Sequence, residues 1–246
     1  MPEQNRESSL VLIKPDALKN SLTGYILSQF SEFHTGLRFA ALKVVTVNLA
    51  LAEEHYAEHK GKFFYPSLLD YIRGYLHYPD EPSKRRVIAI IYRGPNAIKH
   101  IREICGNTNP HDARAQRPGC IRALGTIIPL YDEKGKFIGD RSDNLIHASA
   151  NPQDAEREIK LWFLPTDVPP TVRSFPVETS KEYFYYKNGE VSSEYMPGSY
   201  CFIGPGDIAW KSDMKVLRQI IKGKKPDYST NAVIAKYLIN KDVEKD

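Results

Sequence analysis

The sequence of 246 residues contains few cysteines and no long apolar run. Its three cysteines, Cys105, Cys120 and Cys201, form no Cys-x-x-Cys pair, and any disulfide scheme leaves one thiol over. We therefore expect reduced thiols, which are typical of the cytoplasm. No apolar stretch approaches the roughly 20 residues of a transmembrane helix, and the N-terminus, MPEQNRESS, lacks the apolar core of a signal peptide. These absences predict a soluble, cytoplasmic protein that does not enter a membrane.

An excess of charge of one sign is missing as well. The 34 basic and 30 acidic residues give a net charge of +4, and the basic cluster at residues 222–225 is short. A nucleic-acid-binding surface usually carries a one-sided basic stripe, so the composition argues against nucleic acid as a partner. Apolar content is present in quantity: 41% of the residues are hydrophobic, enough for one core and a second small domain.

Short apolar runs alternate with amphipathic segments in the first two thirds of the chain. Residues 8–14, 37–47 and 86–92 are apolar and predict strands. Helical spacing predicts a helix that Asp16 caps and that ends near residues 34–36, and further helices over residues 51–60 and 94–105. Residues 106–125 are rich in Gly, Pro, Asn and Arg and predict an irregular loop, and residues 126–139 predict a hairpin.

The composition changes after Asp167, where the stretch VPPTVRSFP indicates a linker. We therefore expect a domain of residues 1–166 and a C-terminal extension of residues 167–246. In the extension Asn188-Gly189 predicts a two-residue hairpin turn, and two amphipathic helices are expected over residues 212–222 and 229–240. Because their apolar faces are too small to fold alone, we expect the extension to pack against a neighbouring subunit or the loop; a regulatory or partner-binding module is the alternative.

One histidine lies at the junction of a strand and an amphipathic helix, in the stretch NLIHASANPQDAEREI over residues 144–159. Ser149 or Asn151 can cap the helix, and a proline suits its first position. Glu158 lies near the edge of the apolar face, where its carboxylate could accept a proton from one ring nitrogen of His147 and leave the other lone pair free. The candidate nucleophile is therefore His147. The alternative is a histidine that only fills space, with Glu158 solvated.

This stretch resembles the active-site signature of the nucleoside diphosphate kinases, Asn-Leu-Ile-His-Ala-Ser at residues 144–149. Other segments match that family in order and approximate spacing between residues 8 and 165: Ile-Lys-Pro-Asp at 13–16, His-Tyr at 55–56, Thr-Asn-Pro at 108–110 and Pro-Gly-Cys-Ile-Arg at 118–122. Members of the family carry a phosphoryl group on the histidine between a nucleoside triphosphate and a nucleoside diphosphate.

The resemblance implies an α/β chain of the α+β sandwich type, with a ferredoxin-like βαββαβ antiparallel sheet covered by helices and a small C-terminal α+β extension. It implies ping-pong transfer through a phosphohistidine at His147, Mg²⁺ that bridges the nucleotide phosphates, and a homo-oligomer, either a hexamer or a tetramer. Attack requires a neutral imidazole, so activity should fall below the unperturbed histidine pKa of about 6.5.

The resemblance also implies a role for individual residues. The catalytic residues would be His147, Lys14, Tyr56 and Glu158. The nucleotide-binding residues would be Lys14, His55, Phe64, Leu68, Arg102, Thr108, Arg122 and Asn144. No side chain is assigned as a metal ligand. The cations would stabilise the spread negative charge of the moving phosphoryl group. The base would stack on Phe64 and the ribose would bond Asn144. Neither contact depends on the identity of the base, which implies broad nucleotide specificity.

The chain also departs from the family pattern. Ala150 stands where the family usually has Asp, the loop between Thr108 and Arg122 has about two extra residues, and the hairpin near Asp132 is an insertion. Each matched residue also has a structural interpretation, since aromatic side chains mostly serve burial and isolated charges are mostly solvated. The alternative function is therefore a catalytically impaired nucleotide-binding or scaffold protein of the same fold.

Overall fold

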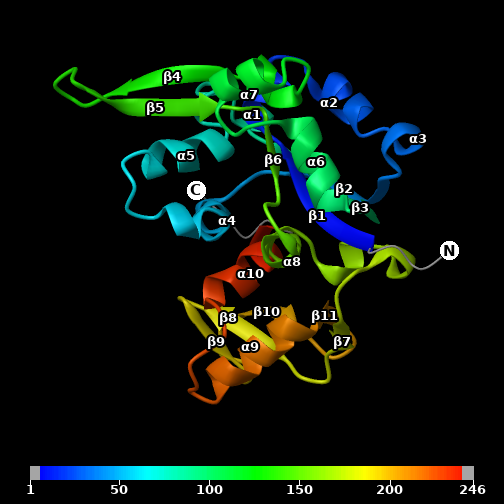
Figure 1. The fold of residues 1–246 in the computed structure, drawn as a ribbon. Helices are drawn as coiled ribbons and strands as arrows, with labels where there is room; N and C mark the ends of the chain where they lie inside the picture. The colour runs from blue at the N-terminus through cyan, green and yellow to red at the C-terminus, as the bar shows by residue number, and fades with distance from the viewer. Residues whose placement is uncertain (1–5, 240–246) are drawn as a thin grey trace. The chain divides into compact units, whose positions relative to one another are not determined.

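The computed structural model describes residues 6–239 and separates into two compact units, Met1–Ile159 and Lys160–Asp246 (Figure 1). The division falls inside α8 (Pro152–Trp162). The boundary that we predicted from composition, after residue 166, lies a few residues further along the chain. None of the helices within residues 6–239 is long and apolar enough to cross a bilayer.

An antiparallel four-stranded sheet with the order β2-β3-β1-β6 organises the first unit. Its strands are β1 (Arg6–Ile13), β2 (Arg38–Val45), β3 (Val87–Pro95) and β6 (Ile146–Ala148). The first strand therefore lies between the third and the last, which is the order of a ferredoxin-like sheet. The predicted fold class is confirmed.

The helices and 3-10 turns of this unit follow the strands in sequence. They are α1 (Pro15–Lys19), α2 (Thr23–Gln29), α3 (Glu32–Thr35), α4 (Leu49–His55), η1 (Ala57–His59), α5 (Tyr65–Ile72), η2 (Pro82–Lys84), α6 (Ala97–Cys105), α7 (Pro110–Gln116), η3 (Ile121–Leu124) and α8.

The core of the first unit lies between the sheet and the helices that connect its strands. Val11 and Ile90 on one sheet face pack with Ile26 of α2 and Ile101 of α6, and α6 runs along β1 and β6. Full burial of one such aliphatic side chain contributes about 1.5–3 kcal/mol. Leu12, on the opposite face of β1, is equally buried, so both faces of the sheet are covered.

The single helix predicted from Asp16 to about residues 34–36 is wrong, because the chain forms three separate helices over this range, α1, α2 and α3. The chain turns between α1 and α2, where Ser21 has a positive φ of 57°. The predicted cap is wrong as well, because the Asp16 carboxylate lies inside the first turn of α1 and accepts a hydrogen bond from the distant Leu145 N at 2.9 Å. A tertiary contact has thus displaced the local one.

Two further boundaries differ from the prediction. Gly94 belongs to β3 and not to a helix. The strand passes close to the turn at Gly36, where a Cβ on Gly94 would lie 2.9 Å from the Gly36 carbonyl oxygen. The loop predicted at residues 106–125 contains α7, whose first backbone N–H groups donate to the Asn109 side chain. An asparagine cap followed by proline is a helix-start signal that the sequence did contain.

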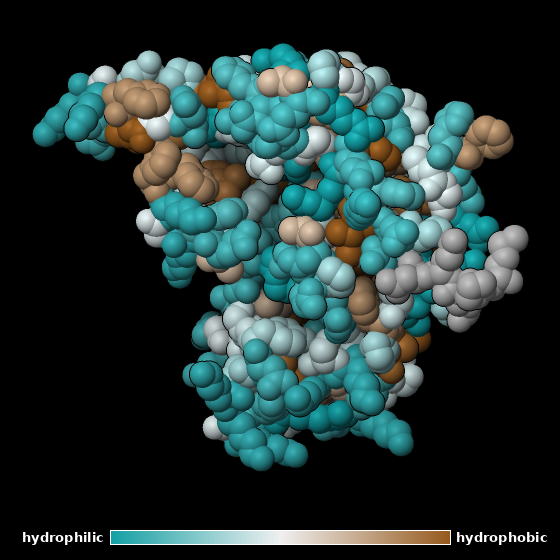
Figure 2. All heavy atoms as spheres, in the orientation of Figure 1, coloured by the Kyte–Doolittle hydropathy of each residue, from teal (hydrophilic) through white to brown (hydrophobic). Residues whose placement is uncertain are grey.

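The predicted hairpin is confirmed as β4 (Thr126–Tyr131) and β5 (Phe137–Asp143), which pair antiparallel. Asp132 closes the turn, since its carboxylate accepts hydrogen bonds from the N–H groups of Lys134 and Lys136. The ring of Phe63 lies against Gly139, where an added Cβ would meet it at 2.3 Å. Apolar side chains gather on the surface of this hairpin (Figure 2).

The second unit has its own strands and helices. They are η4 (Pro165–Asp167), η5 (Pro170–Val172), β7 (Val177–Thr179), β8 (Phe184–Lys187), β9 (Glu190–Ser192), β10 (Tyr200–Ile203), β11 (Ile208–Trp210), α9 (Lys211–Ile221) and α10 (Thr230–Ile239). The predicted turn at Asn188-Gly189 is confirmed, with positive φ at both residues. The predicted end of the last helix, Asn240, lies outside the described residues.

A hydrophobic core fills the second unit. Phe184 and Phe202 of the strands pack with Met214 and Leu217 of α9 and with Val233 of α10. The apolar faces of these helices therefore pack within the unit, and the expected packing on a neighbouring subunit stays a prediction. The faces close on each other and on the strands, which the separate helix patterns could not reveal.

A buried ion pair joins the two helices of this unit. Lys236 Nζ lies 2.6 Å from Asp213 Oδ2, both side chains are only 1% exposed, and Tyr228 Oη donates to Asp213 Oδ1 at 2.6 Å. Desolvation of two charges costs about as much as their attraction returns, whereas loss of one partner alone costs about 3–5 kcal/mol. The pair therefore fixes how α10 docks on α9 more than it adds to stability.

Candidate active site

The candidate nucleophile, His147, lies in the middle of β6. It pairs with Leu12 of β1, so its side chain points to the same sheet face as Leu12. Its neighbours Ile146 and Ala148 point to the other face and belong to the core. The His147 side chain is 18% exposed, which leaves the ring reachable from solvent.

A strained turn leads into this strand. Leu145 has a φ of 68°, a conformation that costs a non-glycine residue about 1–3 kcal/mol. The end of β1 holds the turn on both sides: Leu145 N donates to Asp16 Oδ2 at 2.9 Å, and Lys14 N donates to Leu145 O at 2.9 Å. The Lys-Pro-Asp segment therefore clamps the residues just before His147. Burial raises the pKa of the Asp16 carboxyl.

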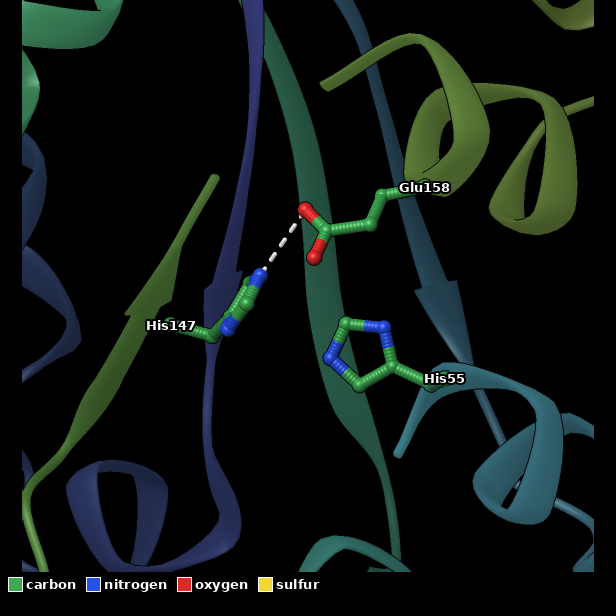
Figure 3. Close-up of side chains that lie close together, drawn as sticks. All are labelled: His55, His147 and Glu158. Atoms are coloured by element: carbon green, nitrogen blue, oxygen red, sulfur yellow. Dashed lines mark hydrogen bonds and ion pairs between the residues drawn. The ribbon is translucent and has the colours of Figure 1, made fainter. Parts of the chain in front are cut away.

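Glu158 of α8 fixes the orientation of the imidazole (Figure 3). Its Oε2 lies 3.0 Å from His147 Nε2 and accepts a hydrogen bond from Ser149 Oγ at 2.7 Å. Burial alone would raise the pKa of Glu158, but the charge of His147 and the hydrogen bonds from His147 and Ser149 outweigh it and lower the pKa to about 2. An ionised carboxylate only accepts, so Nε2 carries the proton and Nδ1 keeps its lone pair.

This is the contact expected from the helix spacing. The two predicted caps are resolved by the structure: Asn151 Oδ1 accepts a hydrogen bond from Asp154 N at 2.8 Å, whereas Ser149 donates to Glu158 and accepts from Leu10 N at 3.1 Å. Ser149 therefore orients the carboxylate, a role that the sequence did not reveal.

The His-Tyr pair at the end of α4 lies beside the nucleophile. The His55 ring is buried, and its centroid is 4.5 Å from that of His147 in an edge-to-face arrangement. Burial, and then the charge of His147, holds the pKa of His55 well below its usual value. Tyr56 Oη is buried and, among residues 6–239, has no hydrogen-bond partner. Burial raises the pKa of Tyr56, so its hydroxyl stays a donor.

Three of the predicted nucleotide contacts are linked to one another. Lys14 Nζ donates to Asn144 Oδ1 at 2.8 Å, and Asn144 Nδ2 donates to the carbonyl oxygen of Thr108 at 2.9 Å. The Lys14 ammonium also lies 4.9 Å from the centroid of the Tyr71 ring. Burial lowers the pKa of Lys14 to about 8, although the nearby Asp16 carboxylate raises it in part. The charge of Lys14 is therefore sensitive to mildly alkaline pH.

The two predicted arginines are placed differently. Arg122 is buried and donates to the carbonyl oxygens of Ile146 and Gly106, so it supports the residue directly before His147. Arg102 is exposed and lines a cavity of about 650 Å³ next to Ala150. His147 does not line this cavity.

The predicted base platform lies at the start of α5. Phe64 is half-buried, and its ring neighbours are Phe63 at 5.3 Å and His59 at 5.6 Å between centroids. Leu68 lies one helical turn further along and is half-buried as well. Both side chains thus present part of their apolar surface to solvent.

A cluster that the sequence did not reveal joins the loop after α5 to the end of the β4–β5 hairpin. Asp143 Oδ2 lies 2.9 Å from His77 Nε2, and Arg141 donates to both carboxylate oxygens, at 2.7 and 3.0 Å. Burial would raise the pKa of Asp143, but His77 and Arg141 outweigh it and lower the pKa. The cluster fixes the residue directly before Asn144. The indication that the sequence offered was that Asp143 directly precedes Asn144.

One group of side chains has the composition of a metal site. Within residues 6–239, His55, His147 and Glu158 are the one set of three or more His, Cys, Asp or Glu whose ligand atoms all lie within 4.8 Å of one another. Mg²⁺ prefers an octahedral shell of oxygens. Two nitrogen donors and one carboxylate do not match that preference.

The comparisons with known proteins agree with this geometry. The sequence model of the family described as "Nucleoside diphosphate kinase" matches residues 7–168. The nucleoside diphosphate kinase of Thermococcus kodakarensis is 34% identical over 201 residues, which cover 82% of this chain and 98% of the relative. That of Symbiobacterium thermophilum is 40% identical over 157 residues, which cover 64% and 87%.

Solved structures of the same family share the fold. The Aquifex aeolicus nucleoside diphosphate kinase superposes with a TM-score of 0.52 at 30% identity and covers 67% of this chain and 99% of its own. A transition state mimic of the Borrelia burgdorferi enzyme with bound vanadate and ADP superposes with a TM-score of 0.51 at 29% identity and covers 69% and 94%. By sequence and by fold, this chain belongs to the nucleoside diphosphate kinase family.

Proposed function

We propose that this nucleoside diphosphate kinase transfers the terminal phosphoryl group by a ping-pong mechanism through a phosphohistidine at His147. The observation that carries the proposal is the hydrogen bond between Glu158 and His147 Nε2, which leaves Nδ1 as the nucleophilic nitrogen. The ring is partly exposed on the side away from the core. The vanadate and ADP complex of the Borrelia burgdorferi relative supports nucleotide binding in this fold.

In the first half-reaction, Nδ1 of His147 attacks the terminal phosphorus of a nucleoside triphosphate. The bond from that phosphorus to the bridging oxygen breaks, and the nucleoside diphosphate leaves with the electron pair. The imidazole gains positive charge, which the ionised Glu158 stabilises at 3.0 Å. A second nucleoside diphosphate attacks the phosphohistidine and reverses the step.

The surrounding donors stabilise the moving phosphoryl group. Lys14 supplies a cation, and the buried Tyr56 hydroxyl supplies a donor that no residue of the described chain uses. Arg122 keeps N–H groups beyond those that it donates to Ile146 and Gly106. Preorganised donors of this kind typically provide the largest part of such catalysis.

The nucleotide contacts remain those that the family resemblance implies. Phe64 and Leu68 would hold the base through their exposed apolar surface, and Asn144 would bond the ribose hydroxyls. Arg102 and Thr108, both exposed, would contact the phosphates together with His55. Because stacking and ribose contacts do not depend on the identity of the base, we expect broad nucleotide specificity.

Mg²⁺ would arrive with the nucleotide. Glu158, the carboxylate at His147, is already bonded to His147 and Ser149, and Ala150 stands where the family usually has Asp. Phosphate oxygens and water would therefore hold the ion, which fits its preference for oxygen ligands. Bound in this way, Mg²⁺ would neutralise phosphate charge.

The cellular setting and the extension are part of the proposal. We place the protein in the cytoplasm, because Cys105, Cys120 and Cys201 are all free thiols. Residues 1–166 would form the catalytic domain and residues 167–246 the extension. Since the second unit closes its own hydrophobic core, we favour a regulatory or partner-binding module over a segment that folds only on another subunit.

Phosphohistidine formation tests the assignment of the nucleophile. Incubation with radiolabelled ATP should give an acid-labile label on the wild type, and a different nucleoside diphosphate should remove it. His147→Gln should lose the label, because it removes the imidazole that Glu158 orients, whereas His111→Gln, which changes an exposed histidine on α7, should keep it. A wild type without label would favour the impaired scaffold, and a labelled His147→Gln would move the nucleophile elsewhere.

Alkaline pH tests the role of Lys14. Its pKa is lowered to about 8, so the ammonium loses its proton as pH rises through that value and attracts the phosphates less. We expect kcat/KM to fall above pH 8 in the wild type, and Lys14→Arg, whose guanidinium stays charged, to lose this alkaline limb. Lys19→Arg, on the exposed end of α1, should keep the wild-type profile. An unchanged limb in Lys14→Arg would contradict the assignment.

A homo-oligomer, either a hexamer or a tetramer, is proposed from the exposed edge of the sheet. Phe39, Leu42 and Val44 of the edge strand β2 are each about half or more exposed, and an exposed apolar edge strand invites pairing with another chain. Leu42→Arg should reduce the mass measured by light scattering, whereas Tyr195→Arg, on the exposed surface of the second unit, should not. A monomeric wild type would refute the proposal.

A further inference from the structure

The side chains around the nucleophile form a second kind of site. His55, His147 and Glu158 bring together two imidazoles and one carboxylate, with their ligand atoms within 4.8 Å of one another (Figure 3). This donor set is used by zinc enzymes and by other transition metal sites. We propose that it binds one divalent transition metal ion, with Zn²⁺ as the probe, and that the bound ion blocks phosphoryl transfer. The predicted loss of phosphoryl transfer depends on the proposed role of His147 as the nucleophile, whereas the predicted metal binding does not.

The geometry requires only small movements. Zn²⁺ binds imidazole nitrogen at about 2.0–2.1 Å and carboxylate oxygen at about 2.0–2.2 Å, which places neighbouring ligand atoms about 3–4 Å apart. His147 Nε2 and Glu158 Oε2 are already 3.0 Å apart, and the ring centroids of His55 and His147 are separated by 4.5 Å. The ligand atoms, all within 4.8 Å of one another, are therefore close to the spacing that one ion requires.

The three side chains differ in their exposure. His55 and Glu158 are buried, whereas the His147 side chain is 18% exposed. An ion would therefore enter along the face of His147. Ser149 remains bonded to Glu158 Oε2 at 2.7 Å, and outer hydrogen bonds of this kind orient a carboxylate ligand.

Two of the three donors, His55 and Glu158, favour the protonation states that a metal ion needs. Metal ligands must be neutral imidazoles and ionised carboxylates. Burial keeps the pKa of His55 well below its usual value, and the contacts of Glu158 with His147 and Ser149 overcome its burial and lower its pKa to about 2. At neutral pH the ion therefore displaces no proton from either group.

Nearby positive charge limits the strength of the site. Arg157 Nη2 lies 3.6 Å from Glu158 Oε1, and Lys14 contributes a further cation at the active site. Arg157 is 45% exposed, so solvent screens its repulsion. The balance favours an exchangeable ion over a permanent structural one. Nitrogen donors select Zn²⁺, Co²⁺ or Ni²⁺ over Mg²⁺, so magnesium on the nucleotide should not compete.

Occupation of the site removes the nucleophile. An ion on Nδ1 of His147 takes the attacking lone pair directly. An ion on Nε2 displaces the proton that Glu158 now accepts, and that proton moves to Nδ1. Either arrangement leaves Nδ1 without a free lone pair, so metal binding and phosphorylation of His147 exclude each other.

Calorimetric titration of the full chain with Zn²⁺, without nucleotide and with Mg²⁺ present, tests the binding. We expect one site in the wild type and in His111→Gln, an exposed histidine outside the cluster, and an affinity at least about tenfold weaker in His55→Gln. Equal affinity in His55→Gln, or no binding to the wild type, would overturn the proposal.

X-ray absorption of zinc bound to the unaltered protein removes any dependence on a variant that fails to fold. The spectrum should report imidazole and oxygen ligands; sulfur ligands would assign the ion to cysteine and overturn the proposal. Zinc should then prevent labelling by ATP, and a chelator should restore it. If ATP labels the protein fully while zinc occupies the site, the proposal that zinc blocks phosphoryl transfer is overturned. If ATP does not label the protein even without zinc, only the proposed phosphohistidine is refuted.

Discussion

The hydrogen bond between the Glu158 carboxylate and His147 Nε2 is the constraint on which the active site depends. Glu158 is buried, and a buried carboxylate without partners would take up a proton. The charge and hydrogen bonds of its neighbours keep it ionised instead, and an ionised carboxylate requires a proton on Nε2. Nε2 is thereby protonated, and the lone pair of Nδ1 remains free to attack. The chemistry of the site is thus decided by the position of Glu158 on α8 beside His147 on β6. Ser149 orients the carboxylate.

The backbone just before His147 is strained. Leu145 adopts a left-handed conformation that lets the chain leave β5, present Asn144 to Lys14 and enter β6 within a few residues. The strain persists because Asp16 and the Lys14 backbone hold the turn from the end of β1. Lys14 and Asp16 are therefore joined in one short motif, in which one side chain supplies charge and the other holds the turn before the nucleophile.

Much of this arrangement could be predicted from the sequence, and the rest could not for identifiable reasons. The strands and the Asn188-Gly189 turn follow from local patterns, and the approach of Glu158 to His147 follows from helical spacing across 11 residues. The contact of Asp16 with Leu145 spans 129 residues, and that of His77 with Asp143 spans 66. Pairings of this kind depend on how the sheet closes. Such long-range contacts also explain where a local pattern gave a wrong prediction. Asp16 was expected to cap a helix, but its carboxylate accepts a hydrogen bond from Leu145 N.

The most direct test of the account is to ask which nitrogen of His147 carries the phosphoryl group. Nuclear magnetic resonance of the phosphorylated protein with ¹⁵N-labelled histidine reports the one-bond coupling between phosphorus and nitrogen. The structure predicts that the coupling involves Nδ1, because Glu158 holds the proton on Nε2. Coupling to Nε2 would show that the carboxylate does not select the nucleophilic nitrogen, and would contradict the account.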